Sequence, residues 1–233
     1  MSSGLAIDQR GIATYTIDEA ATRNALSTAV LEDIERNLRV LNRDPTVRAV
    51  LFTGAGEVFS SGADRAELRD AAKVDEATRL LCSVLTLIDE STIPVICRIN
   101  GPAFGAGLAM VAAADVCVAV REAVFGLPEV RLGLVAGPAA AACLGRIGQA
   151  SALDVLLTGR RFTATDAHQM QLVARVVERA QLDTTVEGVV GDLLLGDQGA
   201  IATTRRIVRQ SSWPTLAQRL QAMYGDPAPV QSR

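Results

Sequence analysis

Residues 93–115 decide the fold, and they read Ile-Pro-Val-Ile-Cys-Arg-Ile-Asn-Gly-Pro-Ala-Phe-Gly-Ala-Gly-Leu-Ala-Met-Val-Ala-Ala-Ala-Asp. The apolar, β-branched run at 93–99 is typical of a buried strand, and the three glycines that follow allow a sharp turn. Residues 108–114 are small and apolar on every side, so we expect a buried helix whose first backbone amides point beyond the turn. Because such a helix end attracts developing negative charge, we predict that it forms one half of an oxyanion hole.

The length and composition indicate one large globular domain, or a core with a small C-terminal addition. The 233 residues are 49% hydrophobic, yet no apolar run reaches the roughly 18 residues that a membrane span needs. We therefore expect no membrane span and assign the surplus apolar surface to contacts between subunits. The formal net charge of −3 argues against a nucleic-acid partner. The first residues lack a basic region followed by an apolar core, so we predict a cytoplasmic protein.

The cysteines do not have the spacing of a metal site. Cys82, Cys97, Cys117 and Cys143 occur singly within apolar patterns, and the chain has only one histidine. Such cysteines are typical of small buried side chains in a reducing compartment. We therefore predict no metal site.

The chain repeats the pattern strand, loop, helix about four times, and further helices gather at the C-terminus. We predict strands at 5–7, 12–17, 47–53, 93–99, 116–120 and 173–177, the first two forming a hairpin. We predict helices from Ser27 to about 44, from about 65, at 76–89, at 108–114, at 151–157, at 163–170 and, with two breaks, from about 185. From Gly225 the chain is rich in proline, and we expect disorder there.

Five short motifs and a single aspartate follow one another along the chain. They are Arg23-Asn-Ala-Leu26, Phe59-Ser-Ser-Gly-Ala-Asp64, Asn100-Gly-Pro-Ala-Phe-Gly-Ala-Gly107 with Asp115, Phe125-Gly-Leu-Pro-Glu129 and Leu157-Thr-Gly159. Together they resemble the enoyl-CoA hydratase/isomerase family, also called crotonases. The resemblance implies an α/β fold, a crotonase-like superhelix of repeated ββα units over residues 1–180, with a C-terminal helical region at 181–225 and a disordered tail at 226–233.

The resemblance also implies a substrate and an assembly. Members of the family bind an acyl-CoA thioester, in which coenzyme A is part of the substrate, and no separate cofactor is implied. They are homotrimers or dimers of trimers. Their shared feature is an oxyanion hole for the thioester carbonyl.

By position, the two backbone donors of this hole are the amides of Ala63 and Ala106. A backbone N–H needs only a small side chain, and Gly62, Gly105 and Gly107 leave both loops open for close approach. Losing one such donor typically costs about 3–4 kcal/mol of barrier. The plain alternative is that these glycines form ordinary tight turns.

Glu129 matches the family's catalytic glutamate by position. Phe125, Leu127 and Val130 flank it, and an apolar surrounding disfavours ionisation and suits a general acid/base. The alternative is a solvated carboxylate in the first turn of a helix.

Two positions depart from the family pattern. Hydratases carry a second glutamate where this chain has Ala109, and dienoyl isomerases carry a further acid where it has Gly137. Shifting a double bond from the 3,4 to the 2,3 position needs only one base. The resemblance therefore favours isomerisation over hydration.

Substrate contacts are less sharply indicated. By resemblance, the backbone at Arg23 and Ala25, with the loops at Ser61 and Gly105, would hold the substrate, and Arg65 would meet a CoA phosphate. An alternative for Arg65 is a solvated side chain on an exposed helix. Candidates for the acyl pocket, each equally suited to the core, are Leu68, Met110, Leu132 and Leu134.

Other functions remain open at this point. The strongest is a crotonase homologue that binds acyl-CoA without turnover, and another enolate reaction such as decarboxylation uses the same hole. A dinucleotide-binding unit lacks the full Gly-x-Gly-x-x-Gly. A serine hydrolase built on Ser60 or Ser61 with His168 lacks Gly-x-Ser-x-Gly.

Overall fold

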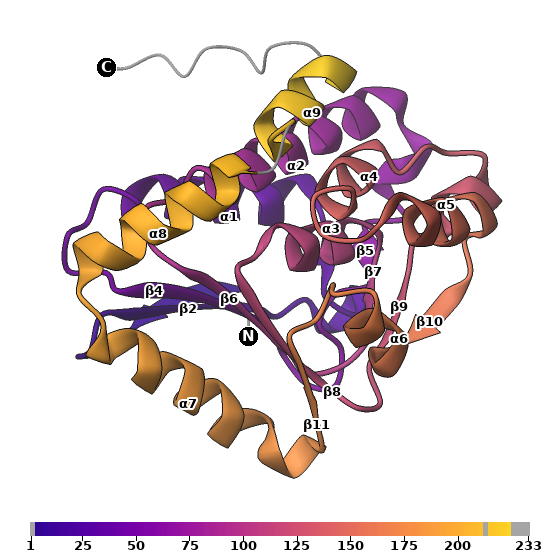
Figure 1. Ribbon diagram of the computed structural model, residues 1–233. Helices are drawn as coiled ribbons and strands as arrows, with labels where there is room; N and C mark the ends of the chain where they lie inside the picture. The colour runs from indigo at the N-terminus through magenta and orange to yellow at the C-terminus, as the bar shows by residue number, and fades with distance from the viewer. Residues whose placement is uncertain (1–2, 212–213, 225–233) are drawn as a thin grey trace, which may run out of the picture.

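The molecule is organised around a six-stranded sheet in the order β1-β2-β4-β6-β8-β11 (Figure 1). The structure, a computed structural model, describes residues 3–211 and 214–224. β1 and β2 form the predicted antiparallel hairpin, and all other neighbours run parallel. The strands are β1 (Gly4–Ile7), β2 (Ile12–Ile17), β4 (Ala49–Gly54), β6 (Val95–Ile99), β8 (Val116–Val120) and β11 (Arg175–Val177).

A short strand follows each of four main strands: β3 after β2, β5 after β4, β7 after β6 and β9 after β8. With β10, which follows α5 (Gln149–Thr158), these strands pair in two small sheets, β3-β5 and β10-β9-β7. Their bounds are β3 (Ala25–Leu26), β5 (Gly62–Ala63), β7 (Ala103–Phe104), β9 (Val124–Gly126) and β10 (Arg161–Thr163). Since β4, β6 and β8 are each followed by a short strand and then a helix, the chain has the repeated ββα units implied by its motifs.

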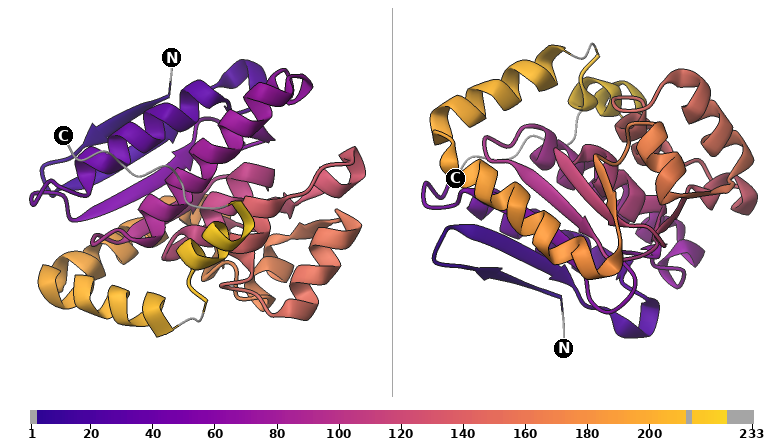
Figure 2. Two further views of the ribbon diagram at one scale, coloured as in Figure 1. Left: turned by 90° about the horizontal axis from the view of Figure 1, so that it is seen from above. Right: turned by 60° about the horizontal axis from the view of Figure 1, so that its bottom comes forward.

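Helices cover both faces of the main sheet. Figure 1 shows α1 and α2 on one side and α7 on the other, and the second view of Figure 2 has α7 in front of the strands. The Arg98 side chain in β6 ties α7 to the sheet, because its Nε donates to Asp183 at 2.7 Å. The helices are α1 (Thr28–Leu41), α2 (Ala71–Asp89), α3 (Gly105–Ala113), α4 (Gly137–Cys143), α5 (Gln149–Thr158), α6 (Ala164–Gln169), α7 (Leu182–Leu195), α8 (Gln198–Ser211) and α9 (Leu216–Tyr224).

The core lies between the sheet and the helices on either side. Every residue of β4 and every residue of α3 is buried. The predicted cap at Ser27 is confirmed, because its hydroxyl accepts a hydrogen bond from the Val30 amide at 3.3 Å. Helix α1 buries one apolar stripe at helical spacing, made of Val30, Leu31, Ile34, Leu38 and Leu41. Full burial of each such side chain contributes about 1.5–3 kcal/mol, so this stripe anchors α1.

The predicted secondary structure was wrong in several places, and helix α4 and the short strands of the two small sheets were not predicted. Instead of one helix from about Arg65 and another at 76–89, the chain forms a single turn at Glu67–Arg69 and then one helix, α2. That helix begins where the Asp70 carboxylate accepts a hydrogen bond from the Ala72 amide. Strand β10 was not predicted, because only Phe162 of its three residues is buried. The tail expected from Gly225 lies outside the described residues.

All four cysteines are buried and unpaired, as predicted. Within residues 3–211 and 214–224, no helix has the length and apolarity that crossing a membrane requires. In the same residues, no group of three or more His, Cys, Asp or Glu side chains is arranged to hold a metal ion.

Candidate active site

The loops after β4 and β6 are bound to each other through their backbones. The amides of Phe59 and Ser60 both donate to the Pro102 carbonyl at 3.1 Å, and the Phe104 amide donates to the Ser60 carbonyl at 3.0 Å. Loops that follow neighbouring parallel strands meet at the carboxyl edge of a sheet, where α/β folds commonly place their ligands. Here the hydrogen bonds hold two glycine-containing segments side by side.

Glycines at the meeting point allow the two loops to touch. A Cβ placed on Gly62, whose φ is +96°, would lie 3.0 Å from the Phe104 carbonyl oxygen. Gly105 has φ +50° and begins α3, so Ala106 is the second helical residue and its amide has no partner within the helix. No side chain caps this helix end, because Phe104 precedes it. The first turn of α3 therefore presents backbone amides beside the Gly62–Ala63 segment.

Glu129 reaches the same point from a third segment. It lies on a short 3₁₀ helix, η3 (Pro128–Leu132), that follows β9. A Cβ on Gly105 would lie 2.7 Å from Glu129 Oε1, so any larger residue would displace this carboxylate. Glu129 Oε2 is buried and has no hydrogen-bond partner among the described residues. Burial raises the pKa of Glu129, and a hydrogen bond from its own backbone amide opposes the rise.

The Arg23–Ala25 segment lies against the Ser61–Ala63 loop. Ala25 pairs with Gly62 in the β3-β5 ladder, and the Ser61 amide donates to the Arg23 carbonyl at 3.1 Å. Arg23 and Asn24 have φ values of +57° and +60°, which are strained for residues other than glycine. The Asn24 side chain stabilises this turn, because its Nδ2 donates to two backbone carbonyls and its Oδ1 accepts the Glu19 amide.

The other predicted substrate contacts are more scattered. Arg65 is exposed and Leu68 is half-buried on the segment that leads to α2. Met110 has no exposed surface, whereas Leu132 and Leu134 on and after η3 are 60% and 36% exposed. Met110 is therefore completely buried, whereas Leu132 and Leu134 are accessible.

The sequence did not predict that Ser60 supports the site. The only signal in the sequence was its place in the loop after a buried strand. Its side chain is completely buried and its hydroxyl accepts the Gly62 amide at 3.2 Å. A Cβ on Gly107 would lie 2.5 Å from the Ser60 Cβ, so serine fills the space that glycine leaves. The hydrolase alternative is wrong, because the hydroxyl of Ser61 donates to the Thr22 carbonyl and the His168 ring contacts the Val173 carbonyl.

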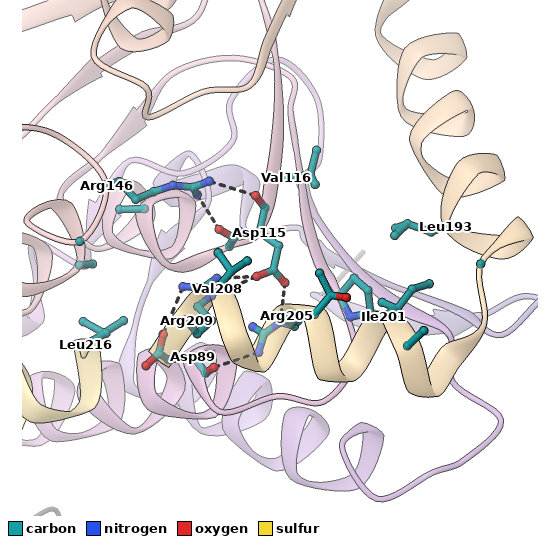
Figure 3. A pocket seen from close by; sticks show the side chains of 18 of the residues that line it. Asp89, Asp115, Val116, Arg146, Leu193, Ile201, Arg205, Val208, Arg209 and Leu216 are labelled. Carbon is teal, nitrogen blue, oxygen red and sulfur yellow. Dashed lines mark hydrogen bonds and ion pairs between the residues drawn. The ribbon is translucent and has the colours of Figure 1, made fainter. Parts of the chain in front are cut away.

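A cavity of about 550 Å³ lies at the opposite end of α3, and none of the predicted site residues lines it. Figure 3 shows its polar centre, in which Asp115 accepts hydrogen bonds from Arg205 Nε at 2.8 Å and Arg209 Nη2 at 2.6 Å. Asp115 also accepts the Val95 amide at 2.7 Å. These contacts join α8 to the core, and they account for Asp115 as a structural residue.

Comparison with known proteins shows which family this chain belongs to. Residues 8–225 match the family described as enoyl-CoA hydratase/isomerase. This chain belongs to that family. It is 30% identical over 210 residues to a probable enoyl-CoA hydratase of Mycobacterium leprae, across 90% of this chain and 82% of that protein. It is also 30% identical over 230 residues to a putative enoyl-CoA hydratase/isomerase of Bacillus subtilis, across 95% and 88%.

Solved structures of enoyl-CoA hydratases share the fold. A crystal structure of the Mycobacterium smegmatis enzyme superposes with a TM-score of 0.87 at 28% identity, covering 96% of this chain and 89% of that one. One from Bacillus anthracis gives a TM-score of 0.87 at 26% identity, covering 96% and 88%. The chain is thus an enzyme of the enoyl-CoA hydratase/isomerase type with the crotonase fold, and the dinucleotide-binding alternative is wrong.

Proposed function

We propose that this member of the enoyl-CoA hydratase/isomerase family moves the double bond of a 3-enoyl-CoA thioester to the 2,3 position through an enolate. The observation that carries the proposal is the buried carboxylate of Glu129, which has one oxygen without a partner and the other against Gly105. An unpaired buried oxygen is unfavourable by about 1–3 kcal/mol, so it is well placed to take a proton from a substrate.

The proposed reaction uses one base twice. The Glu129 carboxylate takes a proton from C2, and the electron pair of that C–H bond moves toward the thioester carbonyl, whose oxygen gains negative charge. The amides of Ala63 and Ala106 donate hydrogen bonds to this oxygen. Protonated Glu129 then gives the proton to C4, where the electron pair of the C3=C4 π bond forms the new C–H bond. The C1=C2 pair of the enolate becomes the C2=C3 double bond, and the oxygen's negative charge returns to re-form the thioester carbonyl. No atom or electron is gained or lost overall.

The absence of a second acid favours isomerisation over hydration. Ala109 lies on α3, where hydratases of the family carry their second glutamate, and its side chain is fully buried. Hydration requires a positioned water, and Glu129 would have to activate it alone. The relatives named as hydratases make this the competing activity.

The remaining substrate contacts and the assembly are part of the same proposal. The backbone at Arg23, Ala25 and Ser61 would hold the adenine end of CoA, with Arg65 near a phosphate. Leu132 and Leu134 would border the acyl chain, with Leu68 and Met110 behind it. We propose a homotrimer or a dimer of trimers in the cytoplasm.

Separate incubations of the purified chain with 3-enoyl-CoA and 2-enoyl-CoA test this function. We expect 2-enoyl-CoA from the first and no 3-hydroxyacyl-CoA from the second. Glu129→Gln should lower the isomerase rate by about 10²–10⁴-fold while leaving thioester affinity in place. Glu178→Gln, at an exposed glutamate paired with Arg121, is the matched control and should keep full activity. Hydroxyacyl product would contradict the role given to Ala109, and thioester binding without turnover would indicate a non-catalytic binder.

A further inference from the structure

The corner where α5 ends lies directly against the η3 turn that carries Glu129. Arg131 Nε donates to the Thr158 carbonyl at 2.8 Å. That carbonyl belongs to the last residue of α5, where helical carbonyls lack partners within the helix and a cation is favourable. The contact therefore satisfies a helix end and fixes η3 at the same time.

Gly159 allows the α5 end and η3 to lie close together. It ends α5 with φ +59°, and a Cβ placed there would lie 3.0 Å from Arg131 Cγ and 3.1 Å from Val130 Cγ1. Both contacted residues directly follow Glu129 in the chain. The Leu157-Thr-Gly159 motif, which the oxyanion hole and the acid do not use, thus has a place beside the acid.

The rest of η3 has little other support from the core. Leu132 at the end of η3 is 60% exposed, and Val135, three residues further along the chain, is 89% exposed. The turn closes mainly on itself, because the Leu134 amide donates to the Glu129 carbonyl at 2.9 Å. A turn with one face open needs an external contact to hold its carboxylate at a set distance from α3.

We propose that the Thr158-Gly159 corner, acting through Arg131, is the positioning site that holds Glu129 beside Gly105. This inference rests on the proposed function, since it concerns the placement of the acid/base. Arg131 is a positioning residue and does not touch the reacting atoms. Misplacement of a catalytic group by about 1 Å costs up to roughly 10²-fold in rate.

The test compares Arg131→Ala, Arg131→Lys and Arg160→Ala in the full-length protein with 3-enoyl-CoA over a range of pH. Arg160 is the matched control, because it is an arginine of the same corner whose guanidinium hydrogen-bonds to Asp154 and, among the described residues, makes no hydrogen bond to η3. We expect Arg131→Ala to lower kcat by about tenfold with KM within about twofold, since positioning affects the reaction step more than binding. The Lys variant should recover part of the loss, and Arg160→Ala should stay near wild type.

The pH profile separates positioning from general loosening of the fold. When η3 moves outward, Glu129 gains water, so the acidic limb of the kcat/KM profile should shift to lower pH in Arg131→Ala. The melting temperature should change little, because Arg131 is exposed. Unchanged kcat and an unchanged limb would overturn the proposal, and so would equal losses in Arg160→Ala.

The failure of this inference is distinguishable from the failure of the proposed function. If Glu129→Gln is inactive while Arg131→Ala behaves as wild type, the acid/base assignment stands and the positioning role is wrong. If Glu129→Gln retains full activity, the assignment itself is wrong and the positioning role falls with it.

Discussion

At its N-terminal end, helix α3 presents backbone amides beside the Glu129 carboxylate, one oxygen of which has no hydrogen-bond partner among the described residues. At its C-terminal end, arginine side chains donate hydrogen bonds to the backbone carbonyls. The Ala113 carbonyl accepts Arg209, and the Ala114 and Asp115 carbonyls accept Arg146. Cations at a helix C-terminus are favourable, and hydrogen bonds remove the penalty of burying these carbonyls. The same nine-residue helix therefore has its C-terminal carbonyls bonded by arginine side chains, while no side chain caps its N-terminal amides.

The largest expected effect is a loss of stability when the ion pairs at the C-terminal end of α3 are broken. Asp115→Ala leaves the buried Arg205 without its carboxylate, and breaking a buried pair costs about 3–5 kcal/mol. Denaturant unfolding monitored by circular dichroism measures this loss. Asp154→Ala removes the carboxylate of an exposed arginine pair and should cost no more than about 1 kcal/mol. Equal unfolding midpoints for the two variants would show that the Asp115 cluster does not stabilise the fold.

An intermediate effect, on activity, is expected when a side chain is added at the N-terminal end of α3. Gly105→Ala places a Cβ against Glu129 Oε1 and should lower kcat/KM for 3-enoyl-CoA by about 10–100-fold, since the carboxylate must move. Gly56→Ala is the control, because Gly56 also has positive φ, +65°, but nothing lies within 4 Å of its Cβ position. Backbone strain alone would affect both variants. A similar loss of activity in Gly56→Ala would therefore show that contact between residue 105 and the Glu129 carboxylate is not the cause.

The smallest expected effect is a gain in stability at neutral pH from Glu129→Gln. Burial raises the pKa of Glu129 in the folded state, so its favourable contribution is complete at low pH and is lost as the pH rises through the folded value. The variant should therefore melt higher than wild type at pH 7–8, and the difference should disappear below about pH 4, where both states are protonated. Glu32→Gln, on the exposed face of α1, provides the comparison. A variant that melts lower at every pH would show that Glu129 is a stabilising residue.

The parts of the fold that the sequence could predict are those with a local cause. The alternation at 12–17, the Ser27 cap and the buried run before Gly101 each produced the expected element. The start of α2 was missed because Glu67–Arg69 and the true helix are both rich in charge, and only the Asp70 cap separates them. Strand β10 was missed because its stability comes from pairing with β9.

For the candidate site, the sequence named residues, and it did not reveal the contacts that hold them in place. The motif order named Ala63, Ala106 and Glu129, yet the roles of Ser60 and Arg131 depend on contacts that no spacing reveals. The position of Met110 was also beyond what the sequence could predict. Because α3 is apolar all round, periodicity assigns no face to it, and the residue predicted near the acyl chain is in the core.

The sequence alone determined that a buried strand, a glycine turn and a small-residue helix follow one another in this chain, because each depends on neighbouring residues and their volume. Only the tertiary structure decided that Gly62, Gly105 and Glu129 meet at one point and that the other end of α3 is closed by arginines. Those contacts join residues from separate ββα units, and the packing of the units against one another sets their distances.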